Sequence, residues 1–171
     1  CGAHDFVSKT LLPTYRAFDD SRHFHDTRKL AAEEGRPLAE LLAPVATSRA
    51  ALGCILCEDA WHIDYGISPA KLLAEAGADL IVNISCSPFT LNKNHKRHRV
   101  FSSLAADCGV PLCYVNNVGI QNNGKTVYTF DGACCIYVSR GHHVTGTPAF
   151  EEGEFTHDVP LARGAEFGVP V

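Results

Sequence analysis

Three short apolar segments, separated by segments of helical character, set the strongest constraint on the fold of this chain. Residues 51–56 (ALGCIL), 79–85 (DLIVNIS) and 111–117 (PLCYVNN) have the composition of strands covered on both faces. A helix is predicted between the first two, beginning at Ser68 with a proline next to it, and a longer helix over residues 92–108 lies between the second and third. Strands that alternate with helices build a largely parallel sheet. The sequence therefore predicts an α/β fold.

The C-terminal part shows a different pattern of apolar and turn-forming residues. Turn signals alternate with short strand patterns, which predicts an antiparallel ribbon. The expected strands are residues 126–130, 133–138 and 142–147, with turns at residues 122–124, 131–132 and 139–141. The remaining residues show no period and predict an arm or linker. We therefore expect a partial domain over residues 1–150 and a C-terminal arm over residues 151–171.

The N-terminal part shows weaker patterns. Residues 2–8 are compatible with a strand, and residues 19–49 are predicted to be mostly loop, with one short helix over residues 37–43 between two prolines. The chain begins with Cys1 and its 171 residues contain no methionine. Because a natural chain of this size normally begins with methionine, we expect a piece of a longer protein.

Composition excludes several classes of function. Apolar residues make up 46% and charged residues 20% of the chain, as in a folded globular domain. No apolar run approaches the ~18 residues of a membrane helix, and no signal-peptide pattern stands at the front, so the expected compartment is the cytoplasm, with no membrane partner. The net charge of −4 argues against a nucleic-acid partner.

The eight cysteines predict free thiols more than a disulfide framework. Five of them stand inside apolar, strand-like runs, which favours buried and reduced side chains. Cys54 and Cys57 form a C-x-x-C pair, but positions three apart on a strand face opposite ways, and no second such pair exists. No metal site is therefore expected.

Cys57 is the first candidate for a catalytic residue. It follows directly on an apolar strand, and in open α/β sheets sites assemble at the carboxyl ends of the strands. The alternative is a buried structural cysteine. The next two residues, Glu58 and Asp59, need partners if this corner is buried.

A nucleophilic cysteine requires a base and a donor for the oxyanion. His62 is near in sequence, but nothing distinguishes it from the other eight of the nine histidines. Lys9 stands at the start of an apolar segment, KTLLPTY, as its single cation. A lysine in that position is equally compatible with a surface residue that covers apolar neighbours.

Several motifs, in order along nearly the whole chain, resemble the nitrilase or carbon-nitrogen hydrolase superfamily. Within it they are most similar to the glutamine-hydrolysing domain of glutamine-dependent NAD synthetases. The motifs are KTLLPTYRAFDDSRHF (9–24), GCILCEDAW (53–61), NISCSPF (83–89), YVNNVG (114–119) and FDG (130–132). The resemblance implies an αββα sandwich. It also implies that Cys57 is the nucleophile and Lys9 the lysine of a Glu-Lys-Cys triad, whose glutamate, on an early strand, is expected upstream of this chain together with the rest of the N-terminal part.

The resemblance implies substrate-binding roles for four further residues. Tyr15, Glu58 and Ser85 match positions that help to hold glutamine in those domains. Asp20 stands where the family usually has a second glutamate, and its side chain is one methylene shorter.

A basic segment, residues 93–99 (KNHKRHR), follows the SPF motif. We expect a solvated basic face. The alternative is that one of Lys93, Lys96 or Arg97 faces a substrate carboxylate.

The implied function is hydrolysis of a carboxamide, glutamine in the first place, through a cysteine thioester. The ammonia would feed a synthetase domain or subunit in NAD synthesis. Amide hydrolysis needs no cofactor, and ATP and magnesium would belong to that synthetase domain. The alternatives are a stand-alone aliphatic amidase and a catalytically incomplete binding or assembly module. The resemblance also leads us to expect a homo-oligomer.

Overall fold

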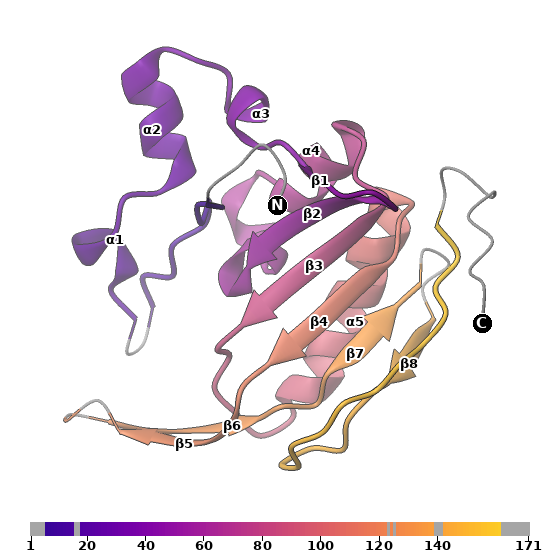
Figure 1. Cartoon of the computed structure of the whole chain (residues 1–171). Coiled ribbons are helices and arrows are strands. Elements are labelled where there is room, and N and C mark those ends of the chain that lie inside the picture. Colours follow the sequence, from indigo (N-terminus) through magenta and orange to yellow (C-terminus); the bar gives the residue numbers. More distant parts are fainter. Residues whose placement is uncertain (1–5, 16–17, 123, 125, 139–141, 162–171) are drawn as a thin grey trace.

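The computed structural model describes residues 6–15, 18–122, 124, 126–138 and 142–161 (Figure 1). Its main element is a six-stranded sheet in the order β1-β2-β3-β4-β7-β8. The three central strands are parallel, and the others run antiparallel to their neighbours. The strands are β1 (Val45–Ala46), β2 (Ala51–Leu56), β3 (Leu80–Ser85), β4 (Leu112–Asn116), β7 (Cys135–Tyr137) and β8 (His143–Thr145).

Two helices connect the parallel strands and pack on one face of the sheet (Figure 1). Helix α4 (Pro69–Glu75) follows β2, and the Ser68 side chain caps it by accepting the N–H of Lys71. Helix α5 (Lys93–Cys108) follows β3 and ends at Gly109 in the left-handed conformation. Its buried residues are Arg97, Val100, Phe101, Leu104 and Ala105. This spacing of three and four residues directs one helix face to the core, and the predicted α/β fold is confirmed.

The other face of the central strands carries apolar side chains that are partly open to solvent. Ile84 on β3 is 55% exposed and Val115 on β4 is 44% exposed, while their neighbours along each strand are buried. Since side chains alternate between the two faces of a strand, these residues lie opposite the helices. In an αββα sandwich this is the face that a second sheet covers.

A two-stranded hairpin extends from the end of β4 (Figure 1). It consists of β5 (Val118–Asn122) and β6 (Val127–Asp131), which pair antiparallel. The second strand and the turn before it were predicted, whereas β5 was not. Four of its five residues are exposed, so its sequence carries no apolar pattern.

The prediction that residues 19–49 are mostly loop is wrong. They contain α1 (Asp20–His23), α2 (Thr27–Glu34) and β1, in addition to α3 (Leu38–Leu41), which confirms the short helix predicted over residues 37–43. Asp26 caps the N-terminus of α2, because its carboxylate accepts the N–H of Lys29, and Gly35 ends the helix. Since α2 buries only two of its residues, the apolar periodicity that reveals a helix is missing.

Some expectations lie outside the described residues. They concern the strand over residues 2–5, the turn at residues 139–141, part of the turn at residues 122–124, and residues 162–171 of the arm. Phe6–Ser8 belong to no strand, and residues 151–161 form no helix or strand. The domain boundary at residue 150 stays a prediction. No helix among the described residues has the length and apolar character to cross a membrane.

The cysteines are less buried than the sequence suggested. The seven described cysteines are free thiols, but only Cys135 is buried, and Cys86 is exposed. The open face of the sheet accounts for part of this difference, because the half-buried Cys54 and Cys113 lie on it, next to the buried Ile55 and Leu112.

Gly53 allows α4 to approach the sheet. A Cβ atom at this position would lie 2.6 Å from Cδ1 of Ile81 and 3.0 Å from Cβ of Ala78. We therefore expect Gly53→Ala to lower the free energy of unfolding by about 1–3 kcal/mol, as overpacking does in a filled core. Chemical denaturation measures the loss, with Gly153→Ala as the control, because a Cβ atom there makes an ordinary 3.4 Å contact with Thr147. Equal stability of the two variants would contradict this packing.

Candidate active site

Cys57 lies at a sharp corner where the chain leaves β2. The strand ends at Leu56, and a 3-10 turn, η1 (Cys57–Ala60), begins at once. Cys57 has a φ of 46°, in the left-handed region that residues other than glycine rarely adopt. Such strained positions occur often at functional sites. The predicted placement of Cys57 at the carboxyl end of a parallel strand is confirmed.

Burial raises the pKa of the Cys57 thiol. Three groups oppose this effect and favour the thiolate: the backbone N–H of Cys86, the charge of Lys9 and the hydroxyl of Ser85. The charge of Glu58 acts together with burial and raises the pKa further, so the thiol remains protonated near neutral pH although three groups favour its anion. Nucleophilic attack from this position requires a base that removes the proton.

Lys9 reaches this corner from the N-terminal segment. Its ammonium forms an ion pair with Asp20, with 2.9 Å between Nζ and Oδ2 and side chains that are each 22% exposed. The segment is fixed by Thr27, whose N–H and hydroxyl both donate to the Lys9 carbonyl, at 3.0 and 3.1 Å. The structure thus brings together Lys9, Asp20 and Cys57, which the sequence had separated by up to 48 residues.

Glu58 has the partners that a buried carboxylate needs. It is 5% exposed, and its two oxygens accept the hydroxyls of Tyr15 (2.9 Å) and Tyr65 (3.0 Å). Burial raises the pKa of Glu58, and these hydroxyls, together with the charges of Lys9 and Lys93, oppose the shift. Tyr15, a predicted site residue, is 48% exposed and lies at the open side of the site. Tyr65, on the 3-10 turn η2 (His62–Tyr65), was not predicted.

Ser85 stands at the end of β3 beside Cys57. It is 6% exposed, and its hydroxyl donates to Oδ1 of Asn83, at 3.0 Å. Asn83 is fully buried, and its Nδ2 donates to the Cys57 carbonyl at 3.5 Å. Asn83 was not predicted, although a polar residue within an apolar strand is a signal for such a role.

The basic segment is only partly the solvated face that we expected. Arg97 is completely buried and forms an ion pair with Asp131. Burial lowers the pKa of Lys93, and its ammonium donates to the Pro88 carbonyl at 2.8 Å. The charge of Lys93 also acts on Cys57 and Glu58, so Lys93 belongs to the candidate site. The helical pattern alone did not reveal which face of α5 turns inward.

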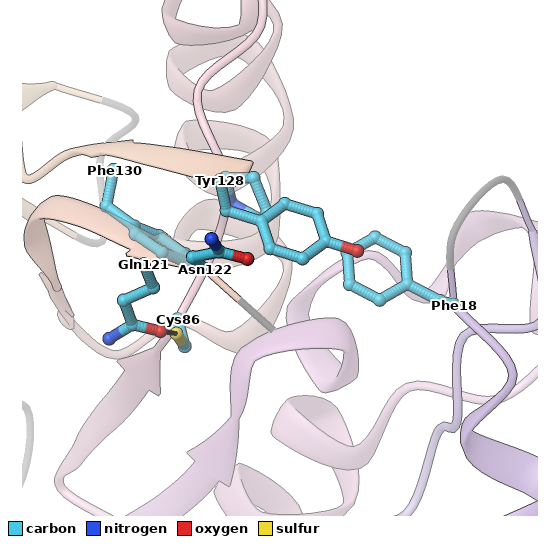
Figure 2. A pocket seen from close by; sticks show the side chains of 7 residues that line it. Phe18, Cys86, Gln121, Asn122, Tyr128 and Phe130 are labelled. Atoms are coloured by element: carbon cyan, nitrogen blue, oxygen red, sulfur yellow. Dashed lines mark hydrogen bonds between the residues drawn. The ribbon is translucent and has the colours of Figure 1, made fainter. Parts of the chain in front are cut away.

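A groove of about 220 Å³ is lined in part by the loop that follows β3 (Figure 2). The Cys86 thiol faces it and contacts Oε1 of Gln121 at 3.9 Å. The rings of Phe18 and Tyr128 stack across it, with centroids 6.3 Å apart. The other lining residues are Pro88, Asn122 and Phe130. None of the predicted site residues lines this groove, and its surface is mainly apolar.

Comparison with known proteins gives a consistent result. The family model of carbon-nitrogen hydrolases matches residues 8–168. The glutamine-dependent NAD(+) synthetase of Synechocystis sp. is 32% identical over 151 residues, which are 84% of this chain and 24% of the relative. The enzyme of the same name from Rhodobacter capsulatus is 36% identical over 157 residues, which are 92% of this chain and 24% of the relative. The chain spans about a quarter of the length of these relatives.

Solved structures share the fold. The glutamine-dependent NAD+ synthetase from Acinetobacter baumannii superimposes with a TM-score of 0.67 at 26% identity, over 86% of this chain and 24% of that chain. A carbon-nitrogen hydrolase from Helicobacter pylori G27 gives a TM-score of 0.66 at 20% identity, over 84% of this chain and 48% of that chain. The nitrilase-like fold expected from the sequence motifs is thereby confirmed.

Proposed function

This chain belongs to the carbon-nitrogen hydrolase family, and from that premise we propose that it hydrolyses a carboxamide, glutamine in the first place, with Cys57 as the nucleophile. The observation that carries the proposal is the corner of β2. There the Cys57 backbone has a φ of 46°, and the Lys9 charge, the Ser85 hydroxyl and the Cys86 N–H all favour a thiolate. A structural cysteine does not require this surrounding.

The reaction follows from these groups. A base removes the thiol proton, and sulfur attacks the amide carbonyl, forming a C–S bond while the carbonyl electrons move to oxygen. The Lys9 ammonium and the backbone N–H of Glu58 stabilise that oxyanion. The protonated base then gives its proton to the departing nitrogen, the C–N bond breaks, and ammonia leaves. Water hydrolyses the thioester and restores the thiol.

The base in this proposal is a glutamate outside the 171 residues. Glu58 is close enough to act on the Cys57 thiol electrostatically, but its two oxygens already accept the hydroxyls of Tyr15 and Tyr65. Those hydrogen bonds suit a carboxylate that stays ionised and attracts a cation. We assign to Glu58 the binding of the substrate's ammonium group instead.

Charged groups of both signs favour an amino acid over a simple amide. Glu58 supplies a negative charge, and Lys93 supplies a positive charge near it, suited to the α-carboxylate. Arg97 is unsuited to that role, because Asp131 neutralises it inside the core. Tyr15 borders the opening, Ser85 lies beside the sulfur, and Asp20 orients Lys9.

The ammonia product would serve a synthetase. This part of the proposal rests on the relatives, which are glutamine-dependent NAD(+) synthetases. ATP and magnesium would act in the synthetase domain and not at Cys57. A homo-oligomer stays a prediction.

Substrate preference in the full-length protein tests the proposal. We expect the kcat/KM for ammonia release from glutamine to exceed that from propionamide by about 100-fold or more, because a site with fixed charges rejects a substrate that leaves them unpaired. Equal rates on both amides would indicate a stand-alone amidase. No release from either amide would indicate a catalytically incomplete module.

A further inference from the structure

Asp59 connects two segments that are far apart in the sequence. Its side chain is buried, with an exposed fraction of 1%. One carboxylate oxygen, Oδ1, accepts the backbone N–H groups of Thr10 (3.0 Å) and Leu11 (2.7 Å). The other, Oδ2, accepts the N–H of Leu56 at 2.9 Å. A single carboxylate therefore receives three backbone donors from two segments.

These donors flank the two residues to which the proposed function assigns chemistry. Thr10 and Leu11 directly follow Lys9, and Leu56 directly precedes Cys57. The segment around Lys9 belongs to no helix or strand. Thr27 holds the Lys9 carbonyl from the start of α2, whereas Asp59 ties the segment to the end of β2. Hydrogen bonds from N–H groups to a carboxylate are about twice as strong as bonds between neutral groups.

We propose that Asp59 is a positioning residue, whose carboxylate sets the distance between the Lys9 ammonium and the Cys57 thiol by holding the backbone beside each. The inference rests on the proposed function for the importance of that distance. Its test follows the thiol itself and needs no turnover, so it can fail or succeed independently of amide hydrolysis.

The protonation state of Asp59 suits this role. Burial raises the pKa of its carboxyl group to about 6, although the three N–H groups and the charge of Lys9 oppose the shift. Above that pH the carboxylate is ionised and holds both segments. Measurements at pH 8 and above therefore examine the ionised form almost exclusively.

The test is the pH dependence of Cys57 alkylation by iodoacetamide in the full-length protein, followed by site-resolved mass spectrometry. Asp59→Asn keeps the side-chain volume but removes the charge and replaces one acceptor oxygen by a nitrogen that cannot accept. The charge of Lys9 lowers the pKa of Cys57. If Asp59→Asn displaces Lys9, the midpoint of the alkylation pH profile of Cys57 should therefore rise by about one pH unit. A lowered melting temperature with an unchanged midpoint would overturn the proposal.

A double-mutant cycle sharpens the result. Lys9→Met should raise the midpoint by itself, and adding it to Asp59→Asn should raise the midpoint little further, since both changes remove the same interaction. Fully additive shifts would show that Asp59 acts on the thiol without Lys9, and would overturn the proposal.

Asp79→Asn is the matched control. The Asp79 carboxylate also accepts a backbone N–H of β2, that of Ala51 at 2.8 Å, but at the opposite end of the strand from Cys57. The midpoint should not move in this variant. A shift equal to that of Asp59→Asn would show a general effect of loosening β2, and would count against the proposal.

Folding of Asp59→Asn is checked by Cys135, which is completely buried and should stay protected from alkylation. If Cys135 becomes reactive, amide hydrogen exchange in the wild-type protein decides instead. The N–H groups of Thr10 and Leu11 should exchange as slowly as that of Leu56, because the same carboxylate holds all three. Exchange at the rate of a free peptide would refute the proposal.

Discussion

Replacing Cys57 by alanine in the full-length protein is expected to lower kcat for glutamine hydrolysis by about 10⁴-fold or more, the scale of losing a nucleophile. Neither Ser85 nor Glu58 is placed to take over the attack. The Ser85 hydroxyl lies beside the thiol but is directed to Asn83, and the Glu58 oxygens are occupied by two tyrosines. The measurement is ammonia release under single-turnover and steady-state conditions.

Cys54→Ala provides the matched control for Cys57→Ala. Cys54 stands three residues earlier on β2, is half-buried like Cys57, and differs in having no lysine or serine that favours its thiolate. We expect near wild-type turnover in Cys54→Ala. Loss of activity in both variants would indicate damage to β2, and full activity in Cys57→Ala would refute the proposed nucleophile.

The alkylation profile of Cys57 separates an activated thiol from an inert one. Burial raises its pKa, so the thiolate fraction, and with it the rate with a small neutral reagent, should rise as the pH increases through and above the ordinary value of 9.0. A glutamine-like electrophile that occupies the substrate site should instead react with Cys57 near neutral pH, because the base acts within the complex. Equal labelling of all cysteines by that electrophile would contradict an active site at Cys57.

Local sequence patterns predicted the central sheet well, because each of its strands and helices is marked by residues within the element itself or at its ends. Apolar runs mark β2, β3 and β4, and Ser68 and Gly109 mark the ends of the helices on their face. Helix α2 and strand β5 were not predicted, for the opposite reason. They bury few side chains, so their stability depends on caps and pairing that leave no apolar period.

The candidate site was predictable to the extent that its residues stand in motifs. Cys57 and Lys9 could be selected, and the structure places them in electrostatic contact. Lys93 was one of three basic residues offered as an alternative, and the sequence could not choose among them, while the role of Tyr65 was not predicted, because each depends on a contact made only after β2, β3 and the following turns have assembled. Long-range contacts of this kind have no signal in a single sequence.

The buried ion pair between Arg97 and Asp131 is the second feature with a large expected effect. Both side chains are completely buried, and the two nitrogens of the guanidinium meet the two carboxylate oxygens at 3.2 and 3.3 Å. Asn94 accepts another of the Arg97 hydrogens, and the guanidinium lies 4.8 Å from the centre of the Tyr114 ring. The pair therefore joins α5 to the end of the β5–β6 hairpin.

This pair also supports the loop that passes Cys57. Asn116 donates to Asp131 at 3.3 Å, accepts the Ser87 N–H at 2.8 Å and donates to the Ser87 carbonyl at 3.2 Å. Ser87 is two residues beyond Ser85, whose hydroxyl favours the Cys57 thiolate. Loss of the ion pair should consequently loosen the wall of the site as well as the core.

We expect Arg97→Met to lower the free energy of unfolding by about 3–5 kcal/mol, because it leaves the Asp131 carboxylate buried without its counter-charge. Urea unfolding of the full-length protein, in which any tryptophan other than Trp61 is replaced by phenylalanine, is followed by fluorescence and measures the loss. Trp61 is the single tryptophan of the 171 residues. The centroid of its ring lies 5.2 Å from that of Phe101, which belongs to the core.

Two further variants identify the cause. Arg97→Met combined with Asp131→Leu should recover much of the stability, since no charge is then left unpaired in the core. Arg22→Met, which breaks an exposed pair with Asp19 whose side chains are 75% and 53% exposed, should cost less than about 1 kcal/mol. If the double variant is less stable than Arg97→Met alone, the loss comes from packing and hydrogen bonds and not from an uncompensated charge.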